Sequence, residues 1–214
     1  MPRDDRRDAR RRGRSARAGA PSRRVSAAGP DSSAKGAPRL PQSGTDTPQR
    51  GDDETLAFLN QVLKNELTAV NQYFLHARML DDWGVRHLGK HEYDESIDEM
   101  KHADRLIQRI LFLGGLPNLQ YLDKLMIGEN VREVIVCDLA LEEKARADLL
   151  PAIAHTLAMG DHVTRMLFER ILESEEEHID YLETQLRLIE STGIQNYIQS
   201  NSGPNAPGVL KGGD

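Results

Sequence analysis

Apolar residues recur at intervals of three and four along most of the chain beyond residue 53. This spacing places them on one face of an α-helix, whereas a half-buried strand would alternate apolar and polar residues. The pattern predicts four long helices, over residues 53–83, 88–113, 130–159 and 161–191, and a short fifth helix over residues 194–200. No strand-like alternation appears, so we expect an all-α protein.

Glycines and prolines mark the ends of these stretches. A glycine follows each long stretch, at Gly84, Gly114, Gly160 and Gly193. Glycine readily adopts the left-handed conformation that commonly follows the last helical turn. Pro117 prevents a simple continuation of the second helix, and Asp161 is a candidate N-cap of the fourth. Pro151 lies inside the third stretch and predicts a kink or a locally broken hydrogen-bond ladder.

The connections between the predicted helices are short, long and short. About 15 residues separate the second helix from the third. This order is typical of a four-helix bundle with one long crossover connection. We therefore expect such a bundle, with a crossover between the second and third helices.

Acidic residues and histidines interrupt the apolar stripes at positions where the periodicity demands apolar side chains. They are Glu66 in the first helix, Glu92, Glu95, Glu99 and His102 in the second, Glu142 in the third, and Glu175 and His178 in the fourth. A buried carboxylate costs several kcal/mol unless it is paired or bound to a metal. Several carboxylates that converge in a bundle core therefore predict a bound cation.

The spacing of these residues sharpens the prediction. Two Glu-x-x-His pairs occur, Glu99 with His102 and Glu175 with His178. Residues three apart share a helix face, so each pair presents a carboxylate beside an imidazole. A further glutamate precedes each pair by 33 residues, Glu66 and Glu142, so the whole set repeats with an offset of 76. Four carboxylates neutralise two divalent ions, and mixed nitrogen and oxygen ligands suit iron, manganese or zinc.

Four segments carry a family signal: NELTAVNQYFLHARM, ESIDEMKHADR, DLALE and EEEHIDYLETQLRLIE. They closely resemble motifs of the bacterioferritins, a family within the ferritin-like di-iron class. The resemblance covers about 150 residues, from position 51 to position 199. It implies that the ferroxidase ligands are Glu66, Glu99, His102, Glu142, Glu175 and His178, with Glu99 and Glu175 as bridges. It also implies a hollow shell of 24 subunits that oxidises Fe(II) with O2 or H2O2 and stores ferric mineral.

Tyr73 follows Glu66 by seven residues, about two helical turns, so the two share a helix face. By the resemblance, it corresponds to the tyrosine that bacterioferritins carry near the di-iron site, and it is a candidate electron donor. The alternative interpretation is a core aromatic residue whose hydroxyl is hydrogen-bonded. The two interpretations predict different surroundings for the hydroxyl.

Met100 directly follows a predicted ligand, so it points about 100° away from the bundle centre. It joins a second apolar stripe on the same helix, formed by Tyr93, Ile97, Ile107 and Leu111. A helix that is apolar on two faces needs a second partner, which favours a twofold dimer interface. The resemblance implies that Met100 binds haem b shared between two subunits. An ordinary interface methionine is the alternative.

Other histidines are expected to bind no metal. His87 and His91 flank the turn into the second helix and are expected to be solvated, and His155 and His162 straddle the predicted break at position 160. One residue departs from the family pattern, because Asp94 stands where many bacterioferritins have a histidine that is linked to iron handling.

The net charge of −6 conceals a division of the chain. Residues 1–48 hold 12 Lys and Arg against 5 Asp, a net charge of +7, which leaves −13 on the remainder. Few apolar residues occur in this segment to offset the entropy of ordering it. We expect a disordered basic extension over residues 1–50, a ferritin-like di-iron domain over 51–200 and a flexible tail over 201–214. The acidic body argues against a nucleic-acid-binding core. The arginines of the extension could still bind nucleic acid, and the alternative explanation of the extension is an upstream start codon assigned in error.

Composition bounds the location and the rival functions. No run of 18 apolar residues occurs, so we expect no membrane span, and the lone Cys137 favours a reducing compartment such as the cytoplasm. Two rival functions are another di-iron oxidase or peroxidase on the same fold and a DNA-associated shell protein that detoxifies iron. The absence of a Cys-x-x-Cys module of the rubredoxin kind argues against the first rival. A complete set of six predicted ligands within one subunit argues against the second.

Overall fold

The computed structural model describes residues 50–203, which form five helices. They are α1 (Asp53–Asp82), α2 (Arg86–Phe112), α3 (Val131–Ala158), α4 (His162–Thr192) and α5 (Ile194–Asn201). No strand occurs within these residues. The all-α bundle with a short fifth helix is therefore confirmed. The extension predicted for residues 1–50 and the tail predicted for 201–214 lie outside the described residues, apart from Arg50 and positions 201–203.

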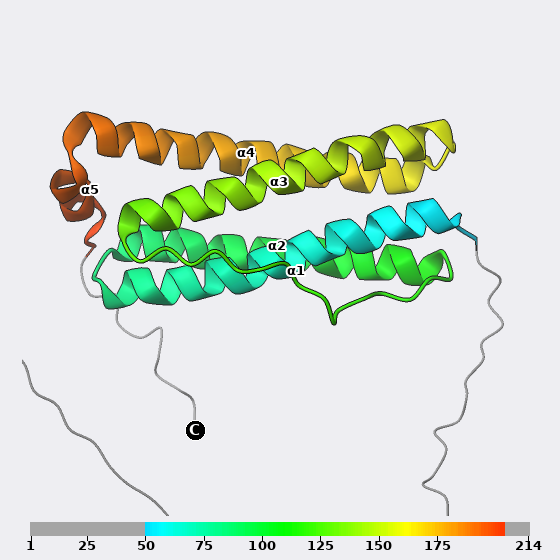
Figure 1. Cartoon of the computed structure of the whole chain (residues 1–214), viewed down its shortest axis with the longest axis horizontal. Coiled ribbons are helices and arrows are strands. Elements are labelled where there is room, and N and C mark those ends of the chain that lie inside the picture. The colour runs from blue at the N-terminus through cyan, green and yellow to red at the C-terminus, as the bar shows by residue number, and fades with distance from the viewer. Residues whose placement is uncertain (1–49, 204–214) are drawn as a thin grey trace, which may run out of the picture. The chain divides into compact units, whose positions relative to one another are not determined.

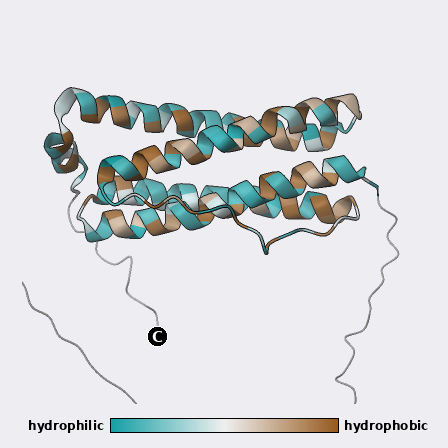
Figure 2. Ribbon diagram, viewed as in Figure 1, coloured by the Kyte–Doolittle hydropathy of each residue, from teal (hydrophilic) through white to brown (hydrophobic). Residues whose placement is uncertain are grey.

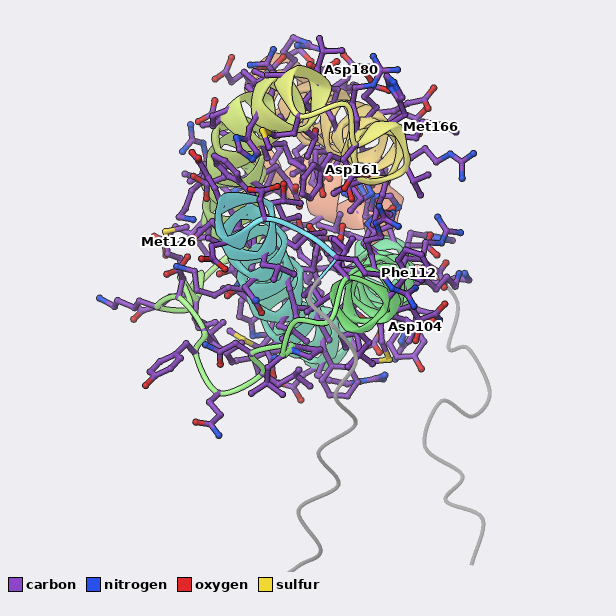
Figure 3. The ribbon with its side chains drawn as sticks, turned by 90° about the vertical axis from the view of Figure 1, so that its right-hand side faces the viewer. Asp104, Phe112, Met126, Asp161, Met166 and Asp180 are labelled. Atoms are coloured by element: carbon purple, nitrogen blue, oxygen red, sulfur yellow. The ribbon has the colours of Figure 1, made fainter. Side chains whose placement is uncertain are left out.

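The four long helices form two layers, α1 with α2 and α3 with α4 (Figure 1). Seen along the bundle, Asp104 of α2 and Asp180 of α4 lie on opposite outer sides (Figure 3). α5 follows the end of α4 and closes one end of the bundle (Figure 1). Each layer carries one copy of the repeated spacing, with Glu66, Glu99 and His102 on α1 and α2, and Glu142, Glu175 and His178 on α3 and α4.

Side-chain caps and glycines define the ends of the helices. Asp52, Asn130 and Asp161 each accept a hydrogen bond from the backbone N–H three residues later, which satisfies a donor that has no partner within the helix. The N-cap predicted at Asp161 is thus confirmed. The four glycines that follow the long helices all have φ between 71° and 82°: Gly84, Gly114, Gly160 and Gly193.

Two local details differ from the sequence pattern. α2 begins at Arg86, two residues before the predicted start, because the Gly89 N–H bonds to the Val85 carbonyl at 3.0 Å and completes an earlier turn. The apolar period missed this turn since Arg86 and His87 are not buried. α3 continues through the exposed Pro151, although proline has no backbone N–H to donate to the helical hydrogen bonds.

The crossover between α2 and α3 lies along the bundle (Figure 1). Side chains of α1 hold it there. Its backbone N–H groups donate to four of these side chains: Asn118 to Asn60 at 2.8 Å, Asp123 to Thr68 at 3.0 Å, Met126 to Gln72 at 2.8 Å and Gly128 to His76 at 3.1 Å. The four acceptors are spaced by multiples of four residues, so they form one polar row on α1. Four backbone N–H groups of a segment without regular structure thereby find partners.

Two apolar clusters flank the polar centre of the bundle. One is built around Leu63, Leu106 and Phe168, and the other around Leu88, Ile135 and Leu182. Burial of such side chains stabilises the fold by about 1.5–3 kcal/mol each. Polar and apolar segments consequently alternate along each helix (Figure 2). None of the helices in the described part of the chain is long and apolar enough to cross a membrane.

Candidate metal centre

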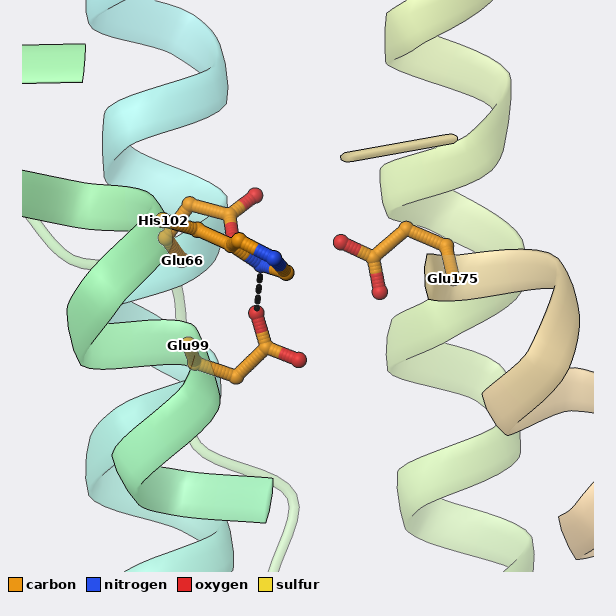
Figure 4. Close-up of side chains that lie close together, drawn as sticks. All are labelled: Glu66, Glu99, His102 and Glu175. Carbon is orange, nitrogen blue, oxygen red and sulfur yellow. Dashed lines mark hydrogen bonds and ion pairs between the residues drawn. The ribbon is translucent and has the colours of Figure 1, made fainter. Parts of the chain in front are cut away.

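The six predicted ligands converge at the centre of the bundle. Each long helix contributes: Glu66 from α1, Glu99 and His102 from α2, Glu142 from α3, and Glu175 and His178 from α4. The four carboxylates are each 1% exposed, which is the burial their periodic positions predict. Figure 4 shows Glu66, Glu99 and His102 together in one layer, with Glu175 facing them from the other.

The ligand atoms form two overlapping groups. Glu66, Glu99, His102 and Glu175 make one group, and Glu99, Glu142, Glu175 and His178 make the other. Within each group the atoms lie within 4.8 Å of one another, close enough to surround one ion. Glu99 and Glu175 belong to both groups, which is the position that a bridging carboxylate requires.

Both imidazoles present the same nitrogen to this cluster. His102 Nδ1 lies 3.2 Å from Glu66 Oε2 and 3.0 Å from Glu99 Oε2. His178 Nδ1 lies 3.3 Å from Glu99 Oε1 and 3.7 Å from both Glu142 Oε1 and Glu175 Oε2. The two halves of the site thus use equivalent atoms of the two histidines.

Several of these atoms are buried without a hydrogen bond from any described residue. They are Glu66 Oε2, Glu99 Oε1, Glu142 Oε1, Glu175 Oε2 and His178 Nδ1. An unsatisfied buried polar atom costs about 1–3 kcal/mol, and more when it is charged. Two divalent cations would complete the coordination of all five atoms and balance four carboxylates. The residues present therefore fit a di-metal site.

Burial and the neighbouring charges raise the pKa values of several groups in the metal-free cluster. Burial, with the neighbouring Glu99 charge, raises the pKa of Glu66 well above its ordinary value, and burial beside Glu142 does the same to the pKa of Glu175. Burial alone would lower the pKa of His102, but its contacts with Glu66 and Glu99 raise it to about 10. Protonation thus reduces the repulsion between the buried carboxylates, and bound cations would reduce it in place of the protons.

Tyr73 lies beside this centre and is 2% exposed. Its ring meets that of His178 edge-on, with centroids 6.4 Å apart and an interplanar angle of 85°. No described residue forms a hydrogen bond with its hydroxyl. The surroundings therefore differ from those of a core tyrosine with a hydrogen-bonded hydroxyl.

Sequence reasoning missed a set of contacts that support His178 from outside the cluster. Its Nε2 contacts Glu95 Oε2, and Glu95 Oε1 lies 3.5 Å from His91 Nε2. The His91 ring packs on Tyr181 with centroids 3.8 Å apart. His91 is thus partly buried, with 29% of its side chain exposed, and is not fully solvated as expected, whereas His87 is exposed. The separation of four residues between His91 and Glu95 was visible in the sequence, but their contact with α4 was not.

A second buried cluster, of His76, Glu92 and Asp138, has metal-competent side chains but a different use. Its ligand atoms also lie within 4.8 Å of one another. However, the Gly128 N–H donates to His76 Nε2, so His76 Nδ1 carries the proton and faces Asp138. Both ring nitrogens are therefore occupied, and we assign no metal there. Burial raises the pKa of Asp138 to about 8 and that of Glu92 well above its ordinary value, so this pair retains a proton.

Met100 lies on the outer face of α2 and is 52% exposed. It is adjacent in sequence to Glu99, whose side chain is buried in the cluster, so the two point in different directions, as the helical period requires. The residues of its stripe range from partly buried to exposed: Tyr93, Ile97, Ile107 and Leu111. An exposed thioether on an apolar face is available to a partner beyond this chain.

This bundle, in which every long helix supplies a buried glutamate and two helices add a Glu-x-x-His histidine, defines the class of ferritin-like carboxylate proteins. The model of the ferritin-like domain matches residues 56–192. The chain is 49% identical over 148 residues to a bacterioferritin of Mycolicibacterium paratuberculosis, covering 69% of this chain and 93% of that protein. It is 48% identical over 155 residues to a bacterioferritin of Brucella melitensis, covering 72% and 96%. For a bacterioferritin of Rhodobacter capsulatus the identity is 45% over 155 residues, with the same coverage. The chain therefore belongs to the bacterioferritin family.

Proposed function

We propose that this protein is the subunit of an iron-storage ferroxidase, which binds two Fe(II) ions as substrate, oxidises them and deposits ferric mineral in a hollow shell of 24 copies. The observation that carries the proposal is the pair of overlapping ligand groups that share Glu99 and Glu175. Five of the ligand atoms are buried and lack hydrogen bonds from the described residues. A pair of divalent ions is the ligand that this arrangement fits.

The residues divide into three roles. Glu66 and His102 bind one Fe(II), Glu142 and His178 bind the other, and Glu99 with Glu175 bridges the two. The ions give up one electron each, which together with two protons reduces O2 to H2O2, or H2O2 to two water molecules. Tyr73 is a candidate source of a further electron, because its phenol lies beside His178 without a hydrogen bond from the described residues.

Haem b belongs to the proposal through Met100. Its thioether is exposed among apolar neighbours, and a second copy related by a twofold axis would present the same group from the other side. A bound haem supplies electron transfer. The contribution of this chain is a soft neutral ligand on a face that is separate from the di-metal centre.

The location and the rival functions follow from other residues. We place the protein in a reducing compartment, the cytoplasm, because Cys137 is a free thiol. The DNA-associated alternative depends on residues 1–48 alone. In a DNA-associated shell protein the di-metal site would ordinarily lie between subunits. A single copy of this chain brings all six proposed ligands together.

Addition of Fe(II) to the metal-free assembly in air tests the proposal. A fast oxidation phase should saturate at two irons per chain, and either Glu66→Ala or His178→Ala should abolish it. Light scattering on both variants checks that they still assemble into the shell. Fast oxidation at the wild-type rate in both variants would contradict the proposal.

A further inference from the structure

The two histidines of the metal centre differ on the side that faces away from the cluster. His178 Nε2 contacts the carboxylate of Glu95, which comes from α2 across the bundle. Within residues 50–203, Nε2 of His102 forms no hydrogen bond or ion pair. On the side that faces away from the cluster, His178 therefore has a carboxylate partner and His102 has none among these residues.

Glu95 is itself held in place. Its side chain is 17% exposed, and its second oxygen lies 3.5 Å from His91 Nε2. The His91 ring packs on Tyr181, which follows His178 by three residues on α4. Glu95 precedes the ligand Glu99 by four residues on α2, so it lies one turn away on the same face. These contacts join α2 and α4 at the level of His178.

We propose that Glu95 is a positioning residue for His178, and that it makes the iron position of Glu142 and His178 bind metal more tightly than the position of Glu66 and His102. The proposal rests on the di-iron function proposed above. A carboxylate that accepts a hydrogen bond from Nε2–H fixes the tautomer in which the Nδ1 lone pair faces the metal. It also makes the imidazole a stronger donor, and loss of such a partner typically costs 10–100-fold in metal affinity.

The inequality of the two positions has a functional consequence. The position of His178 should fill first, and the position of His102 should exchange its ion more readily. Fe(II) would then enter the centre in a fixed order, with oxidation waiting for the weaker position to fill.

Titration of the metal-free shell with Co(II) tests this inference, because the visible d–d absorption of Co(II) reports its ligands without any turnover. Wild-type protein should bind two Co(II) per chain in two resolved steps. His178→Ala should remove the tighter step, and His102→Ala the weaker one. Glu95→Gln preserves the size of the side chain but removes its charge, so it should weaken the tighter step by about 10–100-fold and leave the weaker step unchanged.

Two further variants make the test decisive. Asp104→Asn removes a carboxylate from an exposed position of α2 and should change neither step. Glu95→Asp retains the charge but shortens the side chain, so it should weaken the same tighter step even if Glu95→Gln does not fold. Equal weakening of both steps, or no weakening, would overturn the assignment of Glu95. Failure of the wild type to bind two Co(II) would instead count against the di-metal function.

Discussion

His76 donates its Nδ1–H to both carboxylate oxygens of Asp138, at 2.8 and 2.9 Å, and neither side chain has exposed surface. The direction of this bond follows from the Gly128 N–H, which donates to the other ring nitrogen of His76 at 3.1 Å. Asp138 also accepts a bond of 2.9 Å from Gln72 Nε2. The pair therefore links α1, α3 and the crossover at a point four residues before the predicted ligand Glu142.

Replacement of Asp138 should destabilise the fold through this network. In Asp138→Asn the Oδ1 atom can still accept from Gln72 and His76, but the NH2 group that replaces Oδ2 places its own N–H against the Nδ1–H of His76. A buried donor left unpaired costs about 1–3 kcal/mol, so we expect the free energy of unfolding to fall by that amount. Differential scanning calorimetry at fixed protein concentration measures the change. Asp180→Asn, at an exposed position of α4, is the control and should shift it by less than about 0.5 kcal/mol.

Neutralising one metal ligand should have the opposite effect on the metal-free protein. Burial beside Glu142 already raises the pKa of Glu175, so its ionised form is unfavourable there. Glutamine has nearly the size and the neutral charge of the protonated carboxyl group that this burial favours, so the exchange removes no favourable ion pair. Metal-free Glu175→Gln should therefore unfold at the wild-type temperature or above it.

Bound metal should reverse the order of the unfolding temperatures of the wild type and Glu175→Gln. A divalent ion at 100 times its dissociation constant stabilises the folded state by about 2.7 kcal/mol, provided that it binds only that state. Zn(II) should raise the unfolding temperature of the wild type more than that of Glu175→Gln. Calorimetric scans with and without Zn(II) give both values. An equal gain in the two proteins would show that Glu175 does not bind the metal.

The convergence of the six predicted ligands could be inferred from the sequence, because helical geometry fixes the face on which each one lies and the family resemblance selects the set. Glu99 and His102 must share a face whatever surrounds them, and the position of Glu66 within its apolar stripe aims it at the same core. The bundle then leaves the polar faces one common place to meet. The structure places all six there, within two groups that share two carboxylates.

The supporting contacts were not predictable in the same way. Whether Glu95 contacts His178 depends on the register between α2 and α4, which no local pattern specifies. The use of His76 depends on a crossover without periodicity, whose Gly128 N–H bonds to the ring. Such polar residues resemble ordinary members of a helix face until the tertiary arrangement supplies their partners.

The extension over residues 1–48 should be dispensable for iron chemistry, because its composition does not support a packed core. Deletion of residues 2–48 should leave the size of the assembly and the fast oxidation of two irons per chain unchanged. Light scattering and the oxidation burst measure the two properties. Loss of assembly would contradict the prediction. Loss of salt-sensitive DNA retention alone would identify the extension as a nucleic-acid contact.

Replacement of Met100 should separate haem binding from iron oxidation, because Met100 lies exposed on α2 while the adjacent Glu99 is buried in the cluster. Leucine has nearly the volume and apolarity of methionine but lacks the sulfur that ligates haem iron. Met100→Leu should therefore preserve subunit packing, at a cost below about 1.5 kcal/mol. It should eliminate bound haem and leave the fast oxidation phase intact. The Soret absorbance per chain and the oxidation burst, measured on one preparation, test both parts. Unchanged haem would assign its ligation to another residue, and loss of both signals would show that the two sites are coupled.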